Sequence, residues 1–130
     1  MNVLAQEGRK NGIRVNTLSP TARTRMTEDL IPAEMLALMT PESITPGLLY
    51  LVSEDAPTRT ILCAGAGAFG VARIVETKGA YLPENERTPE VIAARFAEIA
   101  DMAGAQALET ALQQTDKFVN MAAKAKGIRL

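Results

Sequence analysis

The chain has 130 residues, of which 47% are hydrophobic, and this is enough for one globular domain with a core. Its 14 basic and 15 acidic residues give a net charge of −1 and form no long run of one sign, so we expect neither nucleic acid nor an anionic membrane as a partner. Histidine is absent, which excludes a Ser-His-Asp triad and removes the commonest metal ligand, and we therefore expect no metal site.

No segment of the sequence has the pattern of a membrane anchor or a secretory signal. The apolar residues 61–74 are interrupted by glycines and by Arg73, whereas a spanning helix needs roughly 18 apolar residues in a row. Residues 1–12 lack the charged-then-apolar order of a signal peptide. The single cysteine, Cys63, has no partner for an internal disulfide, which fits a reducing compartment. We predict a soluble, cytoplasmic protein.

A helix and a strand are the first elements expected along the chain. Residues 1–12 have helical spacing and end at Gly8 or Gly12, both candidate stops. Only Asn2 would cap this helix, so we expect it to continue a helix that starts before the first residue. Residues 13–18 alternate between apolar and polar and predict a strand, which Ser19-Pro20 is expected to end.

Two helices and a second strand are expected next. A short helix follows Pro32, and Thr40 with Pro41 opens another that runs to about residue 53. The apolar residues expected to be buried on this second helix are Ile44, Leu48, Leu49, Leu51 and Val52. Residues 60–64 are a nearly continuous apolar run, typical of a covered strand. Strand, helices and strand make a βαβ unit, which implies two parallel strands.

Residues 65–70 match the G-x-G-x-x-G pattern of dinucleotide-binding loops. That pattern requires a helix to begin at the loop, but residues 71–77 are rich in β-branched residues and predict an extended segment. We favour a structural turn, for which glycine is suited by its backbone freedom. Phosphate binding is the alternative.

The second half of the chain is expected to be extended at first and then helical. Residues 71–75 predict an extended segment, and residues 83–87 predict a polar linker. Thr88 followed by proline opens a helix over 91–102, in which Ile92, Phe96 and Ile99 share one face. A last helix is expected over about 105–124.

Residues 5–20, AQEGRKNGIRVNTLSP, resemble the helix and sixth strand of short-chain dehydrogenase/reductases. Residues 24–27 look like the family's threonine-containing loop, residues 41–53 like the helix after it, and residues 61–69 like its last strand. The longer tail, with its Thr88-Pro89-Glu90 helix start, is most similar to the (3R)-hydroxyacyl-CoA dehydrogenase part of peroxisomal-type multifunctional β-oxidation enzymes and their bacterial relatives.

The resemblance implies an α/β fold: the C-terminal portion of a Rossmann-like doubly wound parallel sheet, holding its last two strands, with extra C-terminal helices. Residues 1–70 are expected to form the Rossmann-like part, and residues 71–130 an extension of one extended segment and two helices. In this family the helix ending at Gly12 and the last strand lie at subunit interfaces, and an unpaired sheet edge favours association. We therefore expect a homo-oligomer.

The resemblance further implies an oxidoreductase that moves hydride between NAD or NADP and a secondary alcohol or ketone, such as a 3-hydroxyacyl-CoA. The family's glycine-rich cofactor turn and its Ser-Tyr-Lys set precede the part that is matched, so we expect no catalytic residue here, weak or absent cofactor binding and no activity of the chain alone. The family's tyrosine has a lysine four residues on, but Tyr50 is followed by Glu54 and Tyr81 by Asn85. Tyr50 is expected in the core and Tyr81 in a linker. The alternative function is a non-catalytic oligomerisation or binding module.

The residues that the resemblance assigns to the cofactor are Pro20, Thr21 and Thr24. In the family, backbone after the strand's proline contacts the nicotinamide carboxamide, and a threonine a few residues later binds a cofactor phosphate. Here Thr21 stands where glycine is usual, and the loop is one residue short. On the substrate side the candidates are Arg23, Arg25 and Met26, the arginines for an acyl-CoA or cofactor phosphate and Met26 as the start of an apolar segment that closes over substrate. A solvated polar loop and plain packing are the alternatives.

Overall fold

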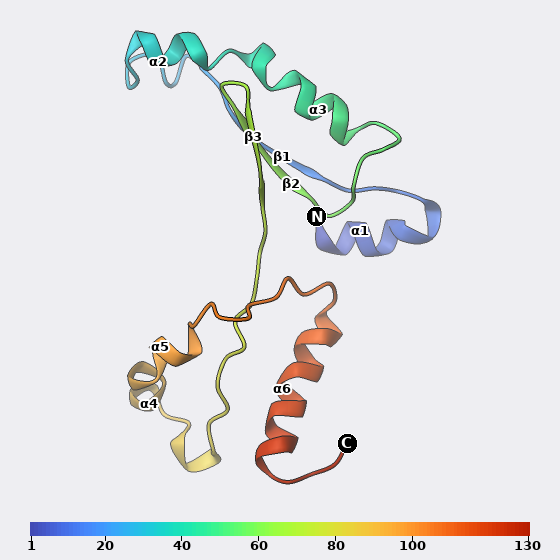
Figure 1. Cartoon of the computed structure of the whole chain (residues 1–130), viewed down its shortest axis with the longest axis vertical. Helices are drawn as coiled ribbons and strands as arrows, with labels where there is room; N and C mark the ends of the chain where they lie inside the picture. Colours follow the sequence, from blue (N-terminus) through green and yellow to red (C-terminus); the bar gives the residue numbers. More distant parts are fainter. The chain divides into compact units, whose positions relative to one another are not determined.

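The computed structural model describes residues 1–130 and divides into two compact units, Met1–Arg73 and Ile74–Leu130. Unit 1 holds all three strands of the one sheet, and unit 2 is built from helices and irregular segments (Figure 1). The elements of unit 1 are α1 (Asn2–Gly8), β1 (Thr17–Thr21), α2 (Ala33–Leu38), α3 (Thr45–Leu51), β2 (Ile61–Gly65) and β3 (Ala68–Ala72), with 3-10 turns at Arg9–Asn11 and Pro41–Ser43.

The sheet has the strand order β1-β2-β3. β1 and β2 are parallel, with Thr17 opposite Ile61 and Thr21 opposite Gly65. The chain between them contains α2 and α3, so the predicted βαβ unit and its α/β class are confirmed. The antiparallel third strand, β3, was not anticipated.

The predicted bounds of the first strand are wrong, since β1 begins at Thr17 and includes Pro20. The N–H of Thr17 donates to the carbonyl of Thr60 in the direction of β2, at 2.9 Å. Alternate residues of a strand point their backbone groups to opposite sides, so Pro20 has its missing N–H on the outer side of β1. Proline is tolerated in an edge strand for this reason. The first helix does end as expected, with Gly12 at φ 68° and its N–H bonded to Arg9.

Residues 65–70 form a β-hairpin and not a phosphate-binding loop. The turn residues Ala66 and Gly67 have φ of 50° and 77°, the two positive values of a type I′ turn between antiparallel strands. β3 follows directly at Ala68, and no helix begins there. The prediction of a structural turn is confirmed, and the extended segment predicted over 71–75 overlaps β3 only at residues 71 and 72.

Helix α3 lies against one face of the sheet (Figure 1). A Cβ atom at Gly47 would lie 2.7 Å from Cε1 of Phe69 and 3.1 Å from Cδ2 of Leu62, so the helix and the strands approach closely at this glycine. The buried apolar residues of unit 1 are Ala5, Ile44, Leu51, Ala56, Leu62 and Ala64. This core is small for its length of chain.

The burial predicted for the second helix is partly wrong. Ile44 and Leu51 are buried as expected, whereas Leu48, Leu49, Tyr50 and Val52 are 47%, 61%, 50% and 72% exposed. A helix with one neighbouring layer can bury only one stripe of side chains. The apolar residues of the sequence are spaced as in a helix that is covered on more than one side. In the structure α3 packs against the sheet on one side.

Unit 2 contains a 3-10 turn (Glu84–Glu86), α4 (Pro89–Ala94), α5 (Phe96–Ile99) and α6 (Ala111–Ala125). The Thr88 hydroxyl accepts from the N–H of Val91 at 3.3 Å, which confirms the predicted helix start. The helix predicted over 91–102 is interrupted at Arg95. The last helix begins at Ala111 and not near 105, because Thr110 and Gln113 form a capping box.

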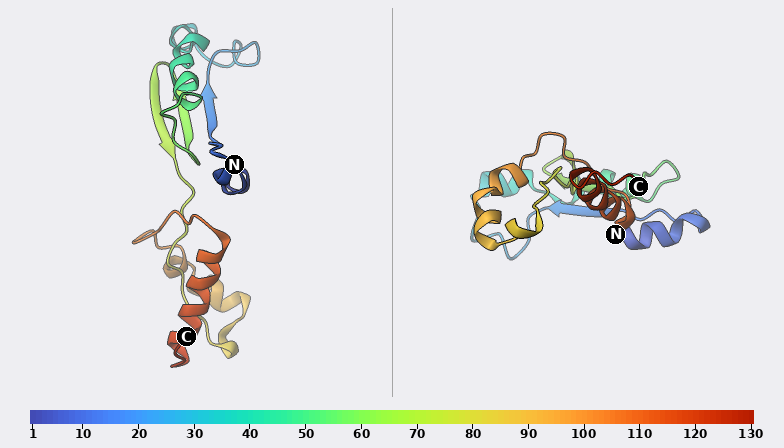
Figure 2. Two further views of the ribbon diagram at one scale, coloured as in Figure 1. Left: turned by 90° about the vertical axis from the view of Figure 1, so that its right-hand side faces the viewer. Right: turned by 90° about the horizontal axis from the view of Figure 1, so that it is seen from below.

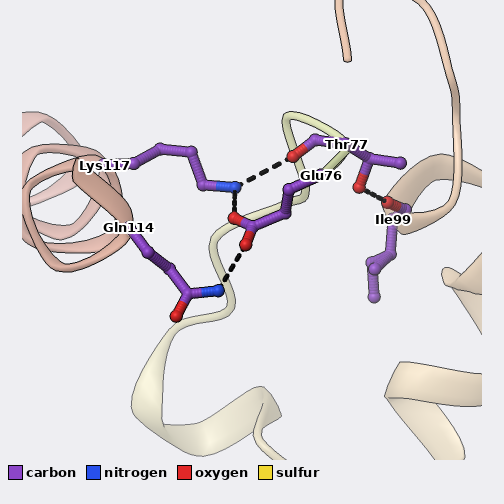
Figure 3. A network of polar contacts seen from close by, with 5 residues as sticks. All are labelled: Glu76, Thr77, Ile99, Gln114 and Lys117. Atoms are coloured by element: carbon purple, nitrogen blue, oxygen red, sulfur yellow. Dashed lines mark hydrogen bonds and ion pairs between the residues drawn. The ribbon is translucent and has the colours of Figure 1, made fainter. Parts of the chain in front are cut away.

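A polar network joins the start of unit 2 to α6 (Figure 3). The Glu76 carboxylate accepts hydrogen bonds from Lys117 and Gln114, and Lys117 also donates to the carbonyl of Thr77 at 2.9 Å. The Thr77 hydroxyl in turn donates to the carbonyl of Ile99 at 2.6 Å. The bond from Lys117 is the main reason that the pKa of the Glu76 carboxyl is lowered.

Candidate functional site

The candidate site lies where the two parallel strands end. Thr21 is the last residue of β1 and Gly65 is the last residue of β2, and the two residues lie opposite each other in the parallel pairing. A Cβ atom at Gly65 would lie 3.1 Å from the carbonyl oxygen and 3.2 Å from Cβ of Thr21, so glycine is needed for the strands to stay close here. Ligands of open α/β sheets bind beyond these carboxyl ends, and the loop after Thr21 is therefore the segment in the right place.

The loop after β1 is held by its own backbone and by one threonine. The N–H of Arg23 donates to the carbonyl of Met39 at 2.7 Å, which ties the loop to the end of α2. The N–H of Thr24 donates to Oγ1 of Thr27, and that hydroxyl donates to the carbonyl of Thr24, both at 2.9 Å. Thr27 therefore stabilises the turn in which Thr24 lies. The sequence did not reveal this role.

Every residue assigned to the site from the sequence is exposed. These residues are Pro20, Thr21, Arg23, Thr24, Arg25 and Met26, and the Met26 side chain is 85% exposed. The first two end β1 and the others lie in the following loop, so all of them are on one continuous segment. Their cofactor and substrate roles stay predictions.

Two side chains before β1 fix the start of β2 against it. Asn16 donates from Nδ2 to the carbonyl of Pro57 at 2.7 Å and accepts from the N–H of Thr60 at 3.1 Å. Arg14 donates to the carbonyls of Ser53, at 3.1 Å, and Glu54. With their starts held in this way, the two strands run in register to the candidate site.

Asn16 illustrates a signal that the sequence did contain. It is half-buried, and a partly buried amide needs hydrogen-bond partners. An asparagine just before a strand could therefore have been predicted to hydrogen-bond to the backbone of the neighbouring segment.

The groups with shifted pKa values lie outside the candidate site. The hydrogen bond from Arg95 lowers the pKa of the Glu98 carboxyl, and the N–H of its own residue lowers the pKa of the Glu90 carboxyl. Both belong to unit 2, as does Glu76. These carboxylates act as ion-pair and capping partners in the fold.

The two tyrosines also lie outside the candidate loop. Tyr50 is on α3 and is half exposed, which contradicts its expected place in the core. Tyr81 lies between β3 and the first turn of unit 2, in an irregular segment as expected, and its carbonyl accepts from Nη1 of Arg95 at 3.3 Å. No group of three or more side chains is arranged to hold a metal ion, and no helix is long and apolar enough to cross a membrane.

Comparison with known proteins identifies relatives for most of the chain. A protein of Mycobacterium tuberculosis named as a short-chain type dehydrogenase/reductase is 38% identical over 109 residues, which are 82% of this chain. The chain belongs to the short-chain dehydrogenase/reductase family. Peroxisomal multifunctional enzyme type 2 of Mus musculus is 34% identical over 92% of the chain, and the peroxisomal hydratase-dehydrogenase-epimerase of Saccharomyces cerevisiae is 39% identical over 75%. No protein-family model matches.

The chain corresponds to only part of each relative. It spans 37% of the length of the mycobacterial dehydrogenase/reductase and 17% of the murine enzyme. The fold agrees with that of full-length peroxisomal multifunctional enzyme type 2 from Drosophila melanogaster, with a TM-score of 0.78 at 24% identity, over 95% of this chain and 23% of that one. The expected resemblance to this family and to the multifunctional enzymes is confirmed.

Proposed function

We propose that the chain forms the cofactor-side and substrate-side wall of an NAD(P)-dependent oxidoreductase that acts on a secondary alcohol or ketone, with a 3-hydroxyacyl-CoA as the substrate class. The observation that supports this most strongly is the similarity to dehydrogenases over 82% of the chain. The acyl-CoA substrate class rests on the resemblance of the tail to the (3R)-hydroxyacyl-CoA dehydrogenase part of multifunctional enzymes, and the relatives named as multifunctional enzyme and hydratase-dehydrogenase-epimerase support that resemblance.

In this proposal the loop after β1 contacts the cofactor. Backbone groups at Pro20 and Thr21 lie at the carboxyl end of a parallel strand, where nucleotide ligands of α/β folds are held. The Thr24 hydroxyl is exposed, and its 3.5 Å contact with Oγ1 of Thr27 is long enough that it can turn to a phosphate oxygen. The loop thus fits one end of NAD or NADP, and this cofactor, when bound, would accept the hydride of the alcohol in its oxidised form or donate a hydride to the ketone in its reduced form.

The substrate side of the same loop offers positive charge and an apolar side chain. Arg23 and Arg25 are exposed, and guanidinium groups bind phosphates through paired hydrogen bonds. Met26 is a flexible apolar side chain, suited to contact with an acyl chain. In this proposal the residues of this chain bind and orient the cofactor and the substrate. Neither tyrosine has the lysine partner that it would need to donate a proton. We therefore propose that the chain alone does not catalyse the reaction.

A chimera tests the proposal. The 109 aligned residues of this chain replace their counterparts in the mycobacterial relative, and NADH oxidation is followed with a 3-ketoacyl-CoA as substrate. We expect turnover, and a roughly tenfold higher KM for NADH in Thr24→Val, because one hydrogen bond to a charged group is lost. Thr24→Ser should restore the KM. A folded chimera that binds NADH but reduces no 3-ketoacyl-CoA or other ketone would refute the proposal.

A non-catalytic association module is the second candidate. The observation in its favour is the exposure of large apolar side chains on α3 and at its end, namely Leu48, Leu49 and Val52, which is typical of surfaces that bind another protein. Calorimetry with NADH and sedimentation of the chain separate the two: no heat at millimolar NADH, together with a dimer or larger species, supports the module.

A further inference from the structure

The turn between α1 and β1 contains an asparagine followed by a glycine. Asn11 and Gly12 are both exposed, and Figure 2 shows that the chain reverses its direction here before it enters β1. Gly12 has φ 68°, and a Cβ atom at this position would meet nothing within 4 Å. The side chain of Asn11 and the backbone of Gly12 therefore lie next to each other in open solvent.

This turn is held by the two backbone hydrogen bonds of a Schellman motif. The N–H of Gly12 donates to the carbonyl of Arg9 at 3.1 Å. The N–H of Ile13 donates to the carbonyl of Gly8, also at 3.1 Å. The preceding segment is lightly packed, since α1 has two buried residues and the 3-10 turn after it has none. Elements with few buried contacts open locally at low cost, so the N–H of Gly12 is released from time to time.

An asparagine followed by glycine is the pair in which the backbone attacks the side-chain amide most readily. Glycine has no Cβ atom to hinder the approach of its nitrogen to Cγ of the asparagine, and its backbone is the least restricted. Asn16, by contrast, precedes a β-branched threonine, and its amide is fixed by hydrogen bonds to Pro57 and Thr60. The remaining asparagines precede valine, glutamate or methionine, and they are Asn2, Asn85 and Asn120.

We propose that Asn11 is a site of spontaneous deamidation, which converts the turn after α1. The nitrogen of Gly12 loses its proton to hydroxide and attacks Cγ of Asn11. The new N–Cγ bond closes a succinimide ring, and the Cγ–Nδ2 bond breaks, so that ammonia leaves. Water then opens the ring. Attack of water at Cγ gives aspartate, and attack at the main-chain carbonyl carbon of Asn11 gives isoaspartate, in which the chain continues through Cγ. Water is the only co-reactant, and the proposal does not depend on the dehydrogenase assignment.

The isoaspartate product cannot keep the Schellman motif. Its main chain is longer by one methylene group before the nitrogen of Gly12. The N–H groups of Gly12 and Ile13 can then no longer both meet the carbonyls that they bind in the unmodified chain. The new carboxylate also adds negative charge after the C-terminal end of α1, where the helix dipole disfavours it. We expect the connection between α1 and β1 to loosen.

Incubation of the folded chain at neutral and at mildly alkaline pH tests the site. A glutamate-specific protease then releases residues 8–28 as one peptide, which contains both Asn11 and Asn16, and fragment masses show where NH2 has been replaced by OH. We expect conversion at Asn11, faster in proportion to the hydroxide concentration, with the isoaspartate detected by enzymatic methylation. No conversion at Asn11 during the time in which the chain converts in urea, or conversion at Asn16 that is as fast, would overturn the proposal.

Two glutamine substitutions separate this site from the other asparagines. Asn11→Gln should abolish the conversion, because attack on the longer side chain would have to close a larger and less favourable ring. The matched control is Asn120→Gln, which changes an exposed asparagine on α6 and should leave the rate as it is. Isoaspartate that forms in Asn11→Gln as in the unchanged chain would also overturn the proposal.

Amide hydrogen exchange tests the effect on the turn. The converted chain carries one more negative charge, so ion exchange separates it from the unmodified chain. We expect the N–H groups of Gly12 and Ile13 to exchange nearly as fast as in an unfolded chain once isoaspartate has formed. Asn11→Asp supplies the charge without the extra methylene group, and it should keep most of the protection. Unchanged exchange at both amides in the isoaspartate form would overturn the proposed loss of the motif.

Discussion

Replacing Gly47 by alanine tests how α3 packs on the sheet. Alanine in a helix is normally favoured over glycine by about 0.5–1 kcal/mol. At this position the new Cβ would lie 2.7 Å from Cε1 of Phe69 and 3.1 Å from Cδ2 of Leu62, and overpacking of this kind costs about 1–3 kcal/mol. The steric cost is the larger effect, and we expect unit 1 to lose roughly 1 kcal/mol in its free energy of unfolding.

The cost should fall when the obstructing ring is removed. In a Phe69→Ala background only the 3.1 Å contact with Cδ2 of Leu62 remains, and Gly47→Ala should then be about 1 kcal/mol less destabilising than with Phe69 present. Unfolding in urea can be followed by fluorescence of Tyr50, with Tyr81→Phe in all variants so that only unit 1 reports. A Gly47→Ala change that stabilises the protein with Phe69 present, or that has the same effect in both backgrounds, would refute the packing described for α3.

Three further predictions concern the polar contacts of the two units. Thr110→Ala removes the capping hydroxyl of α6, and we expect a loss of about 1 kcal/mol and a lower helical signal by circular dichroism, with Thr110→Ser as the control. Asn16→Ala leaves two backbone groups without their partner and should lower the free energy of unfolding of unit 1 by about 1–3 kcal/mol. An unchanged midpoint of urea unfolding would contradict this role of Asn16. Because the pKa of Glu76 is lowered from 4.5, mainly by Lys117, its stabilising effect is complete above that pH and is lost as the pH falls through the folded value. Glu76→Gln should therefore reduce the acid sensitivity of unit 2 in thermal unfolding.

Local sequence signals predicted the elements whose cause lies within a few residues. The stop at Gly12 needs only a left-handed residue, and the start of α4 needs only the Thr88 hydroxyl and a following proline, so both were found. The parallel pairing of β1 and β2 followed from the order of strand, helices and strand. The absence of a helix after Gly70 was also local, because β-branched residues follow it, and the glycine motif was correctly separated from a phosphate loop.

The sequence failed where the answer depends on neighbours in space. Pro20 was taken as the end of a strand, since nothing local shows that its missing N–H lies on a free edge. The burial of Leu48 and Tyr50 was overestimated because a helical pattern does not say how many layers cover it. Thr27 was missed as the residue that shapes the candidate loop, since its bond to Thr24 depends on the turn between them. The site assignments and the cytoplasmic location stay predictions.

Amide chemical shifts of the isotope-labelled chain during titration with NADH test whether the loop after β1 contacts a nicotinamide cofactor. We expect small shifts at millimolar NADH, centred on Thr21, Arg23 and Thr24 and reduced in Thr24→Val. Shifts centred on the hairpin turn at Ala66 and Gly67 and absent from the loop would contradict this contact.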